Sequence, residues 1–175
     1  MKCVLPVSAD FQLISILLEN EPGALSRVVG LFAQRNYNIE TLSVAPTEDP
    51  TLSRITLTTV ADGVQLKQIV RQVNKLIEVY SVKALGGANC VERELVIISI
   101  SGASSKQLVS VIDFAQSLNA SSLVKSEELG ILQFVGSGEE VDHYINCINA
   151  KLVELSPDLR IAELVRSGVA AIELN

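Results

Sequence analysis

The residues best suited to chemistry lie in one turn, Asn20-Glu21-Pro22-Gly23. An apolar run ends before this turn, and apolar residues at helical spacing begin after it at Leu25. Pro22 suits a first helical turn, and Gly23 lets another group approach the backbone closely. The unpaired N–H groups of such a helix start favour an anion, for example the carboxylate of a small ligand. The alternative, a strand-to-helix corner that binds nothing, is the commoner case on physical grounds alone.

Other reactive side chains offer no constellation for catalysis or metal binding. The single histidine, His143, lies off the apolar stripe of its expected helix and therefore in solvent, so no Ser-His-Asp triad can form around it. The three cysteines are far apart, without metal-ligand spacing, and fit free thiols in a reducing compartment. Glu48-Asp49, between two prolines, is more typical of a solvated turn than of a cation site. We therefore predict no catalytic residue and no metal site, and a function in binding.

Composition narrows the class of protein further. The chain has 175 residues, 48% hydrophobic and 19% charged, which suffices for one ordinary domain or two small ones. The net charge is -6 and the 14 Lys and Arg residues are scattered, without a basic stripe for a phosphate backbone, so we expect no nucleic-acid binding. Neither a signal-peptide core nor an apolar stretch of membrane-spanning length is present in the sequence. We expect a cytoplasmic protein without membrane contact.

Hydrophobic periodicity in the first half predicts six elements in the order βαββαβ. Strands are expected over 11–18, 39–45, 52–60 and 79–85, and helices over about 23–36 and from Asp62 through a stripe ending at Ile77. Asp62 and Gln65 have the spacing of an N-terminal cap and its partner. This order is typical of a ferredoxin-like domain, with two helices on one face of a four-stranded antiparallel sheet.

The first strand is apolar on both of its faces. Leu13 and Leu17 alternate with Ile14 and Ile16, so the sheet face without helices requires a cover. Dimerisation through this domain is the economical prediction.

The second half repeats the same order. Ser104 with Gln107 and Ser137 with Glu140 have capping-box spacing ahead of two helical stripes. Strands are expected over 94–100, 119–125, 129–135 and 161–174. The predicted class is α+β, with an N-terminal extension (1–10), a first ferredoxin-like domain (11–86), a linker (87–93) and a second ferredoxin-like domain (94–175).

Three adjoining motifs in the first half carry a family resemblance. They are Leu17-Leu18-Glu19-Asn20-Glu21-Pro22-Gly23-Ala24-Leu25-Ser26-Arg27-Val28, Arg35-Asn36-Tyr37-Asn38-Ile39-Glu40 and Val44-Ala45-Pro46-Thr47-Glu48-Asp49-Pro50-Thr51-Leu52-Ser53-Arg54. Shorter matches follow at Val91-Glu92-Arg93-Glu94-Leu95 and Arg166-Ser167-Gly168-Val169. The sequence resembles the small regulatory subunits of acetolactate synthase, also called acetohydroxyacid synthase.

The resemblance implies an ACT domain over 11–86, a regulatory module of ferredoxin-like fold. Its implied role is to activate a separate catalytic large subunit, which carries thiamine diphosphate, magnesium and FAD, and to confer feedback inhibition by valine or a related branched-chain amino acid. The small subunit itself would be non-catalytic and without cofactors. In similar ACT dimers the amino acid lies between two protomers. The corresponding effector-binding positions here are Asn20, Gly23, Ala24, Leu25, Asn38 and Ile39.

In this interpretation the Gly23 and Ala24 N–H groups hold the ligand carboxylate, and the Asn20 and Asn38 amides supply acceptors for its ammonium group or further donors. Leu25, together with Ile39, offers an apolar wall.

The motif that holds Glu48, Asp49 and Arg54 is shared with the family although no ligand role follows from it, so we expect these residues to contact the catalytic subunit. Two other functions stay open at this point. The chain could be a free-standing ACT sensor acting on another metabolic protein, or a small ferredoxin-like enzyme, for which the sequence supplies no acid–base pair.

Overall fold

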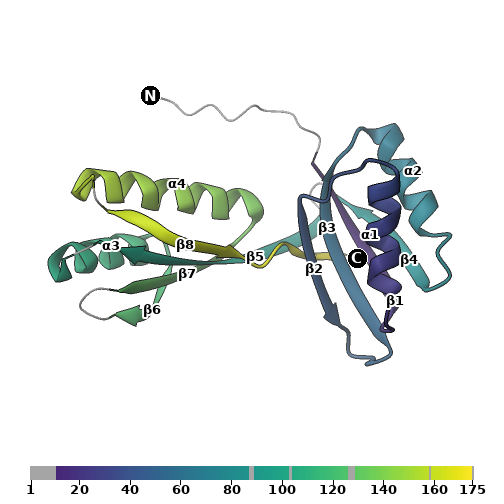
Figure 1. Cartoon of the computed structure of the whole chain (residues 1–175), viewed down its shortest axis with the longest axis horizontal. Helices are drawn as coiled ribbons and strands as arrows, with labels where there is room; N and C mark the ends of the chain where they lie inside the picture. Colours follow the sequence, from purple (N-terminus) through teal and green to yellow (C-terminus); the bar gives the residue numbers. More distant parts are fainter. Residues whose placement is uncertain (1–10, 87–88, 103, 126–128, 158, 175) are drawn as a thin grey trace. The chain divides into compact units, whose positions relative to one another are not determined.

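Two βαββαβ sets of elements follow one another along the chain (Figure 1). The computed structural model describes residues 11–86, 89–102, 104–125, 129–157 and 159–174. The first set comprises β1 (Phe11–Glu19), α1 (Ala24–Gln34), β2 (Thr41–Pro46), β3 (Leu52–Val60), α2 (Gly63–Val73) and β4 (Val79–Leu85). The second comprises β5 (Cys90–Ser101), α3 (Ser105–Ser117), β6 (Ser121–Lys125), β7 (Gly130–Gly136), α4 (Gly138–Leu155) and β8 (Arg160–Arg166). A last strand, β9, spans Ala170–Glu173.

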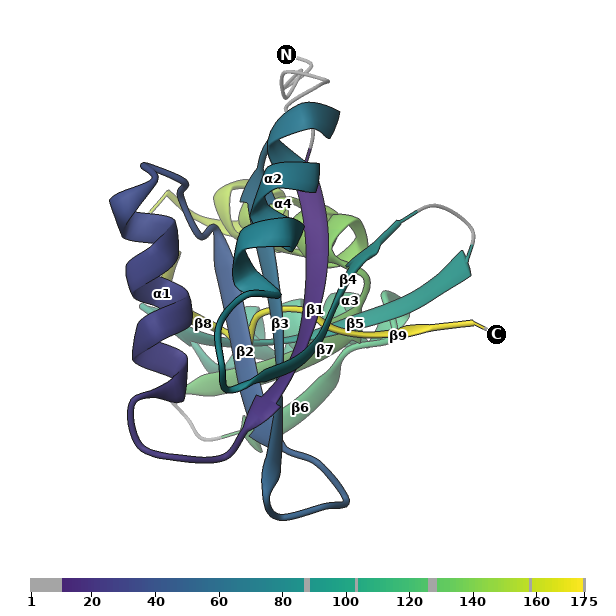
Figure 2. The same ribbon diagram turned by 90° about the vertical axis from the view of Figure 1, so that its right-hand side faces the viewer.

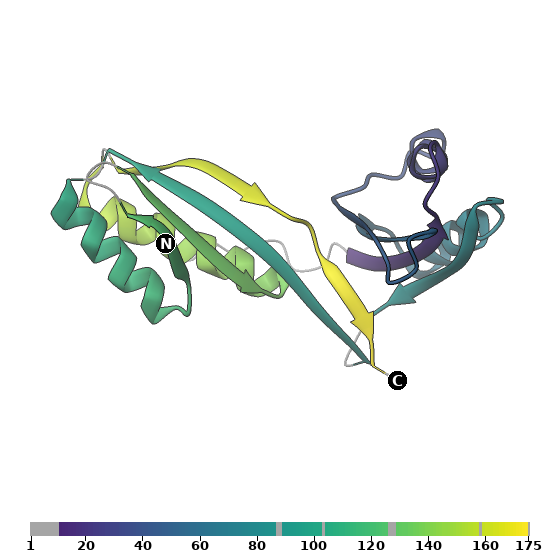
Figure 3. The same ribbon diagram turned by 90° about the horizontal axis from the view of Figure 1, so that it is seen from below.

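Both sheets have the ferredoxin-like strand order. The first runs β2-β3-β1-β4 and the second β6-β7-β5-β8, and the strand pairs within each path are antiparallel. Figure 2 looks onto α1 and α2 with the strands of the first sheet behind them, and Figure 3 shows α3 and α4 on one side of the second sheet. The predicted α+β class with two ferredoxin-like domains is confirmed.

Each sheet packs its helix-covered face into a separate aliphatic core. In the first core Ile14 and Ile16 of β1 meet Val28 and Phe32 of α1 and Ile69 of α2, and all five are at most 1% exposed. Burying a side chain of this size contributes roughly 1.5–3 kcal/mol. Three capping boxes, at Asp62, Ser104 and Ser137, begin α2, α3 and α4 as their spacing predicted.

α2 ends earlier than the sequence predicts. The apolar stripe was expected to run to Ile77, but the helix ends at Val73 and the Ile77 side chain is 88% exposed. Lys75 N–H bonds to the Gln72 carbonyl and Leu76 N–H to the Val73 carbonyl, so i,i+3 turns replace the helix while the chain turns toward β4. Leu76 still packs against the core, whereas Ile77 points away from it.

The C-terminal segment belongs to the first compact unit, which differs from the expected boundary. That unit runs to Val91 and includes the residues from Gly168 onward, and the second unit is Glu92–Ser167. The expected final strand over 161–174 is divided into β8 and β9 by Gly168, whose φ is 73°. β5 begins at Cys90, so part of the expected linker 87–93 is strand. Residues 1–10, the expected N-terminal extension, lie outside the described residues.

The helix-free face of the first sheet is mostly polar. The polar residues that β1, β2 and β3 place on this face are Ser15, Thr41, Ser43, Arg54, Thr56 and Thr58. The Thr41 and Thr58 hydroxyl oxygens lie 2.7 Å apart in one hydrogen bond. Of the apolar residues on this face, Leu13 and Leu85 pack against Val169 and Ala171 of the chain's own C-terminal segment, whereas Leu17 lies opposite Arg54 and is half-buried. The C-terminal segment thus covers part of the apolar surface for which a partner was expected, whereas Leu17 and the 65% exposed Phe11 of β1 lie outside this cluster. Dimerisation through this domain stays a prediction.

Tyr144 in α4 provides a test of the second core. Tyr144 is 2% exposed and its ring stacks on that of Phe134 at 4.6 Å between ring centroids, yet its hydroxyl has no hydrogen-bond partner among the described residues. Burial raises the pKa of Tyr144 from 10.0 to about 12. The neutral phenol is therefore favoured in the folded state, and stability is lost as the pH rises from about 10 toward 12.

We expect Tyr144→Phe to leave the free energy of unfolding unchanged at pH 7 or to raise it by up to about 1 kcal/mol, because an unsatisfied hydroxyl is removed. Urea titrations at pH 7 and above pH 10 measure this, and the advantage of the variant should grow with pH. Tyr80→Phe is the matched control, because Tyr80 is 62% exposed. A clear loss of stability in Tyr144→Phe at pH 7 would contradict the assignment.

Candidate functional site

The turn before α1 forms an unfilled helix start. Gly23 is its N-cap with φ 94°, no side chain caps the helix, and no acidic residue lies in its first turn. In the described part of the chain, no acceptor pairs with the N–H groups of Gly23, Leu25 or Ser26. A Cβ added at Gly23 would meet no atom within 4 Å, so open space adjoins these donors. The arrangement suits a carboxylate.

One of the expected donors, the Ala24 N–H, already has a hydrogen-bond partner within the turn. The Ala24 N–H donates to the Glu21 carbonyl at 3.2 Å, and the Ala24 side chain is 4% exposed in the first core. Ser26, which the sequence reasoning missed, supplies a donor in its place. The signal was available, since the first four N–H groups of any helix have no partner within the helix. Leu25 is 38% exposed beside these donors and offers an apolar contact.

Asn20 is fixed by the loop between β2 and β3. Its N–H donates to the Thr51 carbonyl at 2.7 Å and its Nδ2 to the Pro50 carbonyl at 3.0 Å. Asp49 stiffens this loop by accepting from the Thr51 N–H at 2.9 Å and from the Thr51 hydroxyl at 2.7 Å, and both bonds hold the pKa of the Asp49 carboxyl below its usual value. Asn20 thus keeps its Oδ1 for a cationic group such as an ammonium.

Asn38 and Ile39 form a second cluster, just ahead of β2. The Thr59 hydroxyl, fully buried, donates to the Asn38 carbonyl at 2.6 Å, and Asn38 Nδ2 donates to Glu40 Oε1 at 2.6 Å. Asn38 is exposed and retains its Oδ1 as an acceptor. Ile39 is partly buried against the first core, so only part of its side chain remains for a ligand.

The two clusters do not meet within one chain. Gly23 precedes α1 and Asn38 follows it, and this helix of 11 residues is about 16 Å long at 1.5 Å per residue. Thr51 and Thr59 anchor the two asparagines. Thr51 lies just before β3 and Thr59 near its end, about 26 Å apart for an extended strand. A single protomer therefore supplies two half-sites.

The residues expected to contact a catalytic subunit are divided between two surfaces. Glu48 and Asp49 lie exposed in the β2–β3 loop, where Asp49 has the structural role described above. Arg54 lies on the helix-free face of the sheet and its Nη1 donates to the Ser15 hydroxyl at 3.2 Å. Asp49 and Arg54 both have side-chain hydrogen bonds, whereas the Glu48 side chain has none with the described residues.

An ion pair between the buried Glu94 and the partly exposed Arg166 joins two segments of the second unit. Arg166 Nε and Nη2 donate to the two oxygens of Glu94 at 2.9 and 2.6 Å, and Glu94 is 1% exposed. The Ser167 hydroxyl accepts from the Leu95 N–H at 3.0 Å, so the residue after Arg166 is anchored as well. The hydrogen bonds to Glu94 raise the pKa of the Arg166 guanidinium above its usual value. Both segments carry the family resemblance in the sequence, but no local pattern indicates that they form a pair.

Across the ranges that the structure describes, no three His, Cys, Asp or Glu side chains are grouped so that they could hold a metal ion. The exposed His143 lies 3.5 Å from the Cys147 sulfur, as a pair without a third ligand. No helix in the same ranges is long and apolar enough to cross a bilayer.

Comparison with known proteins shows to which family the chain belongs. The sequence profile of the AHAS small subunit-like ACT domain matches residues 14–81. The acetolactate synthase isozyme 3 small subunit of Salmonella typhimurium is 41% identical over 161 residues, which cover 92% of this chain and 94% of that protein. The chain belongs to the acetolactate synthase small-subunit family.

Two further relatives agree with the family membership. The acetolactate synthase small subunit of Haemophilus influenzae is 39% identical over 163 residues, covering 92% of this chain and 94% of that one. The crystal structure of the acetolactate synthase small subunit from Thermotoga maritima has a TM-score of 0.78 and 28% identity, covering 93% of this chain and 96% of its own. Residues 14–81 are accordingly an ACT domain of the type found in these small subunits, and the predicted resemblance is confirmed.

Proposed function

We propose that this small subunit is a non-catalytic regulator of acetolactate synthase that raises the activity of the catalytic subunit and confers feedback inhibition by valine or a related branched-chain amino acid. The observation that carries the proposal is the uncapped start of α1, with its unpaired N–H groups. The names of the relatives support the partner. Thiamine diphosphate, magnesium and FAD belong to the catalytic subunit, and the complex acts in the cytoplasm.

The half-sites match the three parts of a branched-chain amino acid. The N–H groups of Gly23, Leu25 and Ser26 suit its carboxylate. The free Oδ1 atoms of Asn20 and Asn38 suit its ammonium group, and the half-exposed Leu25 suits its aliphatic side chain.

Two protomers complete one site in this proposal. β2 is an edge strand, and its Leu42 and Val44 are 37% and 41% exposed, as at an edge that pairs with a second copy. Antiparallel pairing of two β2 strands brings the start of one beside the end of the other. The end of β2 leads into the loop that holds Asn20, and Asn38 precedes its start. A two-fold dimer then has two shared sites.

The direct test adds the purified protein to the catalytic subunit of acetolactate synthase and follows acetolactate formation with and without valine. We expect higher activity on addition and a return toward the basal rate with valine. Neither activation nor a valine effect would refute the function. Valine binding without any effect on the catalytic subunit would instead fit a free-standing ACT sensor.

Glu48→Lys tests the proposed contact through the β2–β3 loop. Glu48 is the cleaner position because Asp49 organises the loop that holds Asn20. Reversal of one exposed interface charge should raise the small-subunit concentration for half-maximal activation about threefold. Valine affinity, measured by calorimetry on the isolated small subunit, should stay as in the wild type. Unchanged activation would remove the loop from the interface.

A further inference from the structure

The outer side of α2 is positively charged in a chain with a net charge of -6. Lys67 and Arg71 lie one helical turn apart in α2, and Lys75 follows at the same spacing in the turn after the helix. All three are exposed, and residues 63–77 contain no Asp or Glu. The ion pairs among the described residues all involve other cations. We call Lys67, Arg71 and Lys75 the α2 basic surface.

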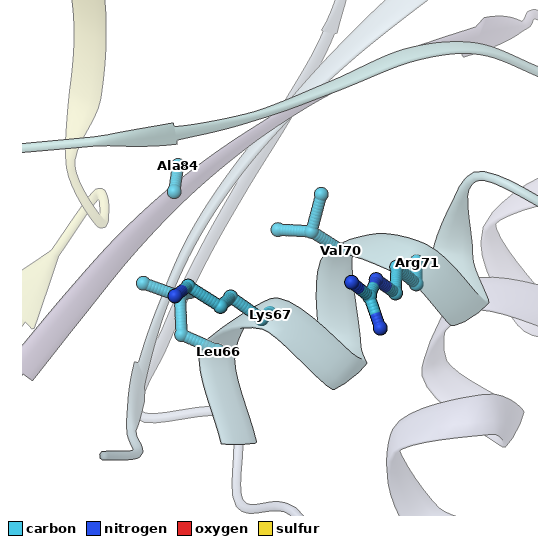
Figure 4. A pocket seen from close by; sticks show the side chains of 5 residues that line it. All are labelled: Leu66, Lys67, Val70, Arg71 and Ala84. Atoms are coloured by element: carbon cyan, nitrogen blue, oxygen red, sulfur yellow. The ribbon is translucent and has the colours of Figure 1, made fainter. Parts of the chain in front are cut away.

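An apolar groove adjoins the α2 basic surface. It lies between α2 and the edge strand β4, has a volume of 380 Å³, and is lined by Leu66, Lys67, Val70, Arg71 and Ala84. Figure 4 shows the Leu66 and Val70 side chains rising from α2 on the side of the strand that carries Ala84, with Lys67 and Arg71 alongside. The groove therefore joins an apolar floor to two cations that have no ion-pair partner in the described chain.

We propose that the α2 basic surface and its groove are the docking site for an acidic segment of the catalytic subunit, with aliphatic side chains between its carboxylates. Unpaired cations on an otherwise acidic protein attract carboxylates and steer their approach. The groove has the volume to accept two or three aliphatic side chains, and their burial adds affinity that charge alone does not supply. This inference rests on the proposed function, because it names a second surface, besides the β2–β3 loop, that meets the catalytic subunit.

Other occupants fit the surface less well. A second copy related by a two-fold axis would oppose Lys67, Arg71 and Lys75 with the same cations, and like charges repel. A nucleic acid would meet three cations on a protein of net charge -6, without a basic stripe to follow its phosphates.

The α2 basic surface can be altered without touching the effector half-sites. The hydrogen bonds of Asn20 and Asn38 run to the β2–β3 loop, Thr59 and Glu40, and none involves α2. The helix start is held by Asp62 and Gln65, which remain in place. Loss of docking and loss of effector binding are therefore separable.

The test is the pair of substitutions Lys67→Glu and Arg71→Glu in the full-length small subunit. The concentration for half-maximal activation of the catalytic subunit should rise about tenfold at low salt, and the difference from wild type should shrink as salt screens the charges. Lys106→Glu with Arg160→Glu is the matched control, because both residues are exposed in the second unit and the change in net charge is equal. We expect at most about a twofold effect there.

Three further measurements decide the outcome. Valine binding to the isolated variant should equal that of wild type, and its sedimentation should be unchanged. Lys67→Ala with Arg71→Ala, which keeps strong helix formers, should shift half-maximal activation in the same direction and covers the case in which the reversed variant does not fold. Shifts no larger than those of the control, or altered self-association, would overturn the docking site while leaving the proposed function in place. If wild type fails to activate, the proposed function fails first and the docking site with it.

Discussion

Replacement of Gly23 by aspartate will abolish inhibition by valine while activation of the catalytic subunit persists. The new carboxylate would lie at the uncapped start of α1, where the ligand carboxylate is proposed to bind, and would both occupy the N–H groups and repel the ligand. We expect valine affinity to fall by about 100-fold or more, since charge-assisted hydrogen bonds are replaced by repulsion. Inhibition curves of the reconstituted enzyme, together with calorimetry of the isolated small subunit, measure this.

Gly23→Ala is the control for the backbone. Gly23 has φ 94°, a conformation that costs about 1 kcal/mol for a residue with a side chain, whereas an added Cβ meets no atom within 4 Å. Alanine carries the backbone cost without the charge and should retain inhibition with a shift of a few-fold. Valine sensitivity of the aspartate variant equal to that of the alanine variant would contradict the carboxylate site.

Hybrid dimers can test whether the site is shared between protomers. Gly23→Asp damages one half-site and Asn38→Ala the other, and the two half-sites lie at opposite ends of α1. A mixed dimer of the two variants would hold one site with both defects and one intact site. We expect the isolated mixed dimer to recover about half of the valine binding that is absent from either parent, and an equal mixture that re-pairs at random to recover about a quarter, by the two-fold symmetry of the sites. No restoration would place the whole site within one chain.

Local signals in the sequence were sufficient for most of the fold. The capping boxes at Asp62, Ser104 and Ser137 need only residues three positions apart, so their helices begin where the spacing predicts. The strand order follows from the βαββαβ pattern, because a ferredoxin-like sheet has few other ways to cover one face with two helices.

Features that depend on distant parts of the chain escaped prediction. Ile77 continues a helical spacing, but the need to reach β4 ends the helix at Val73. Gly168 turns the chain at φ 73°, with its Cβ position 3.0 Å from the Leu42 carbonyl oxygen, and the segment beyond it returns to the ACT domain. No periodicity in the segment itself reveals its contacts with Leu13 and Leu85.

The effector half-sites likewise combine one feature that the local sequence predicts with supports that come from distant residues. The turn at Gly23 was recognisable because proline and glycine have local conformational meaning. The carbonyls of Pro50 and Thr51 that fix Asn20, and the Thr59 hydroxyl that holds the Asn38 carbonyl, come from residues 21 to 31 positions away in the chain. Such supports follow from the register of β3 against its neighbours, which the sequence pattern alone does not set.

Arg166→Met should be the most destabilising single substitution that we propose. It leaves the Glu94 carboxylate, 1% exposed, without either of its two hydrogen bonds from Arg166. Removing one partner of a fully buried ion pair costs about 3–5 kcal/mol, because the other charge stays desolvated and unpaired. The Arg166 side chain is 32% exposed, so we expect the loss to lie at the lower end of this range. Urea or thermal unfolding of the second unit, followed by circular dichroism, measures the loss.

Asp142→Asn is the matched control on the same arginine. The Asp142 side chain is 50% exposed and bonds to Arg166 Nη1 at 2.6 Å, so water can replace the lost contact. We expect at most about 1 kcal/mol for this exposed pair. A loss in Asp142→Asn as large as that in Arg166→Met would mean that the exposed carboxylate, and not Glu94, depends on the guanidinium.

The double variant Glu94→Leu with Arg166→Met separates the cost of an unpaired charge from the value of the pair. Apolar residues of similar size leave no buried charge, so most of the stability lost in Arg166→Met should return, to within about 1 kcal/mol of wild type. Arg166 directly precedes Ser167, whose hydroxyl accepts from the Leu95 N–H, and Gly168, where the chain re-enters the first unit. If the double variant remains as unstable as Arg166→Met, the arginine stabilises this junction through its geometry and not by neutralising Glu94.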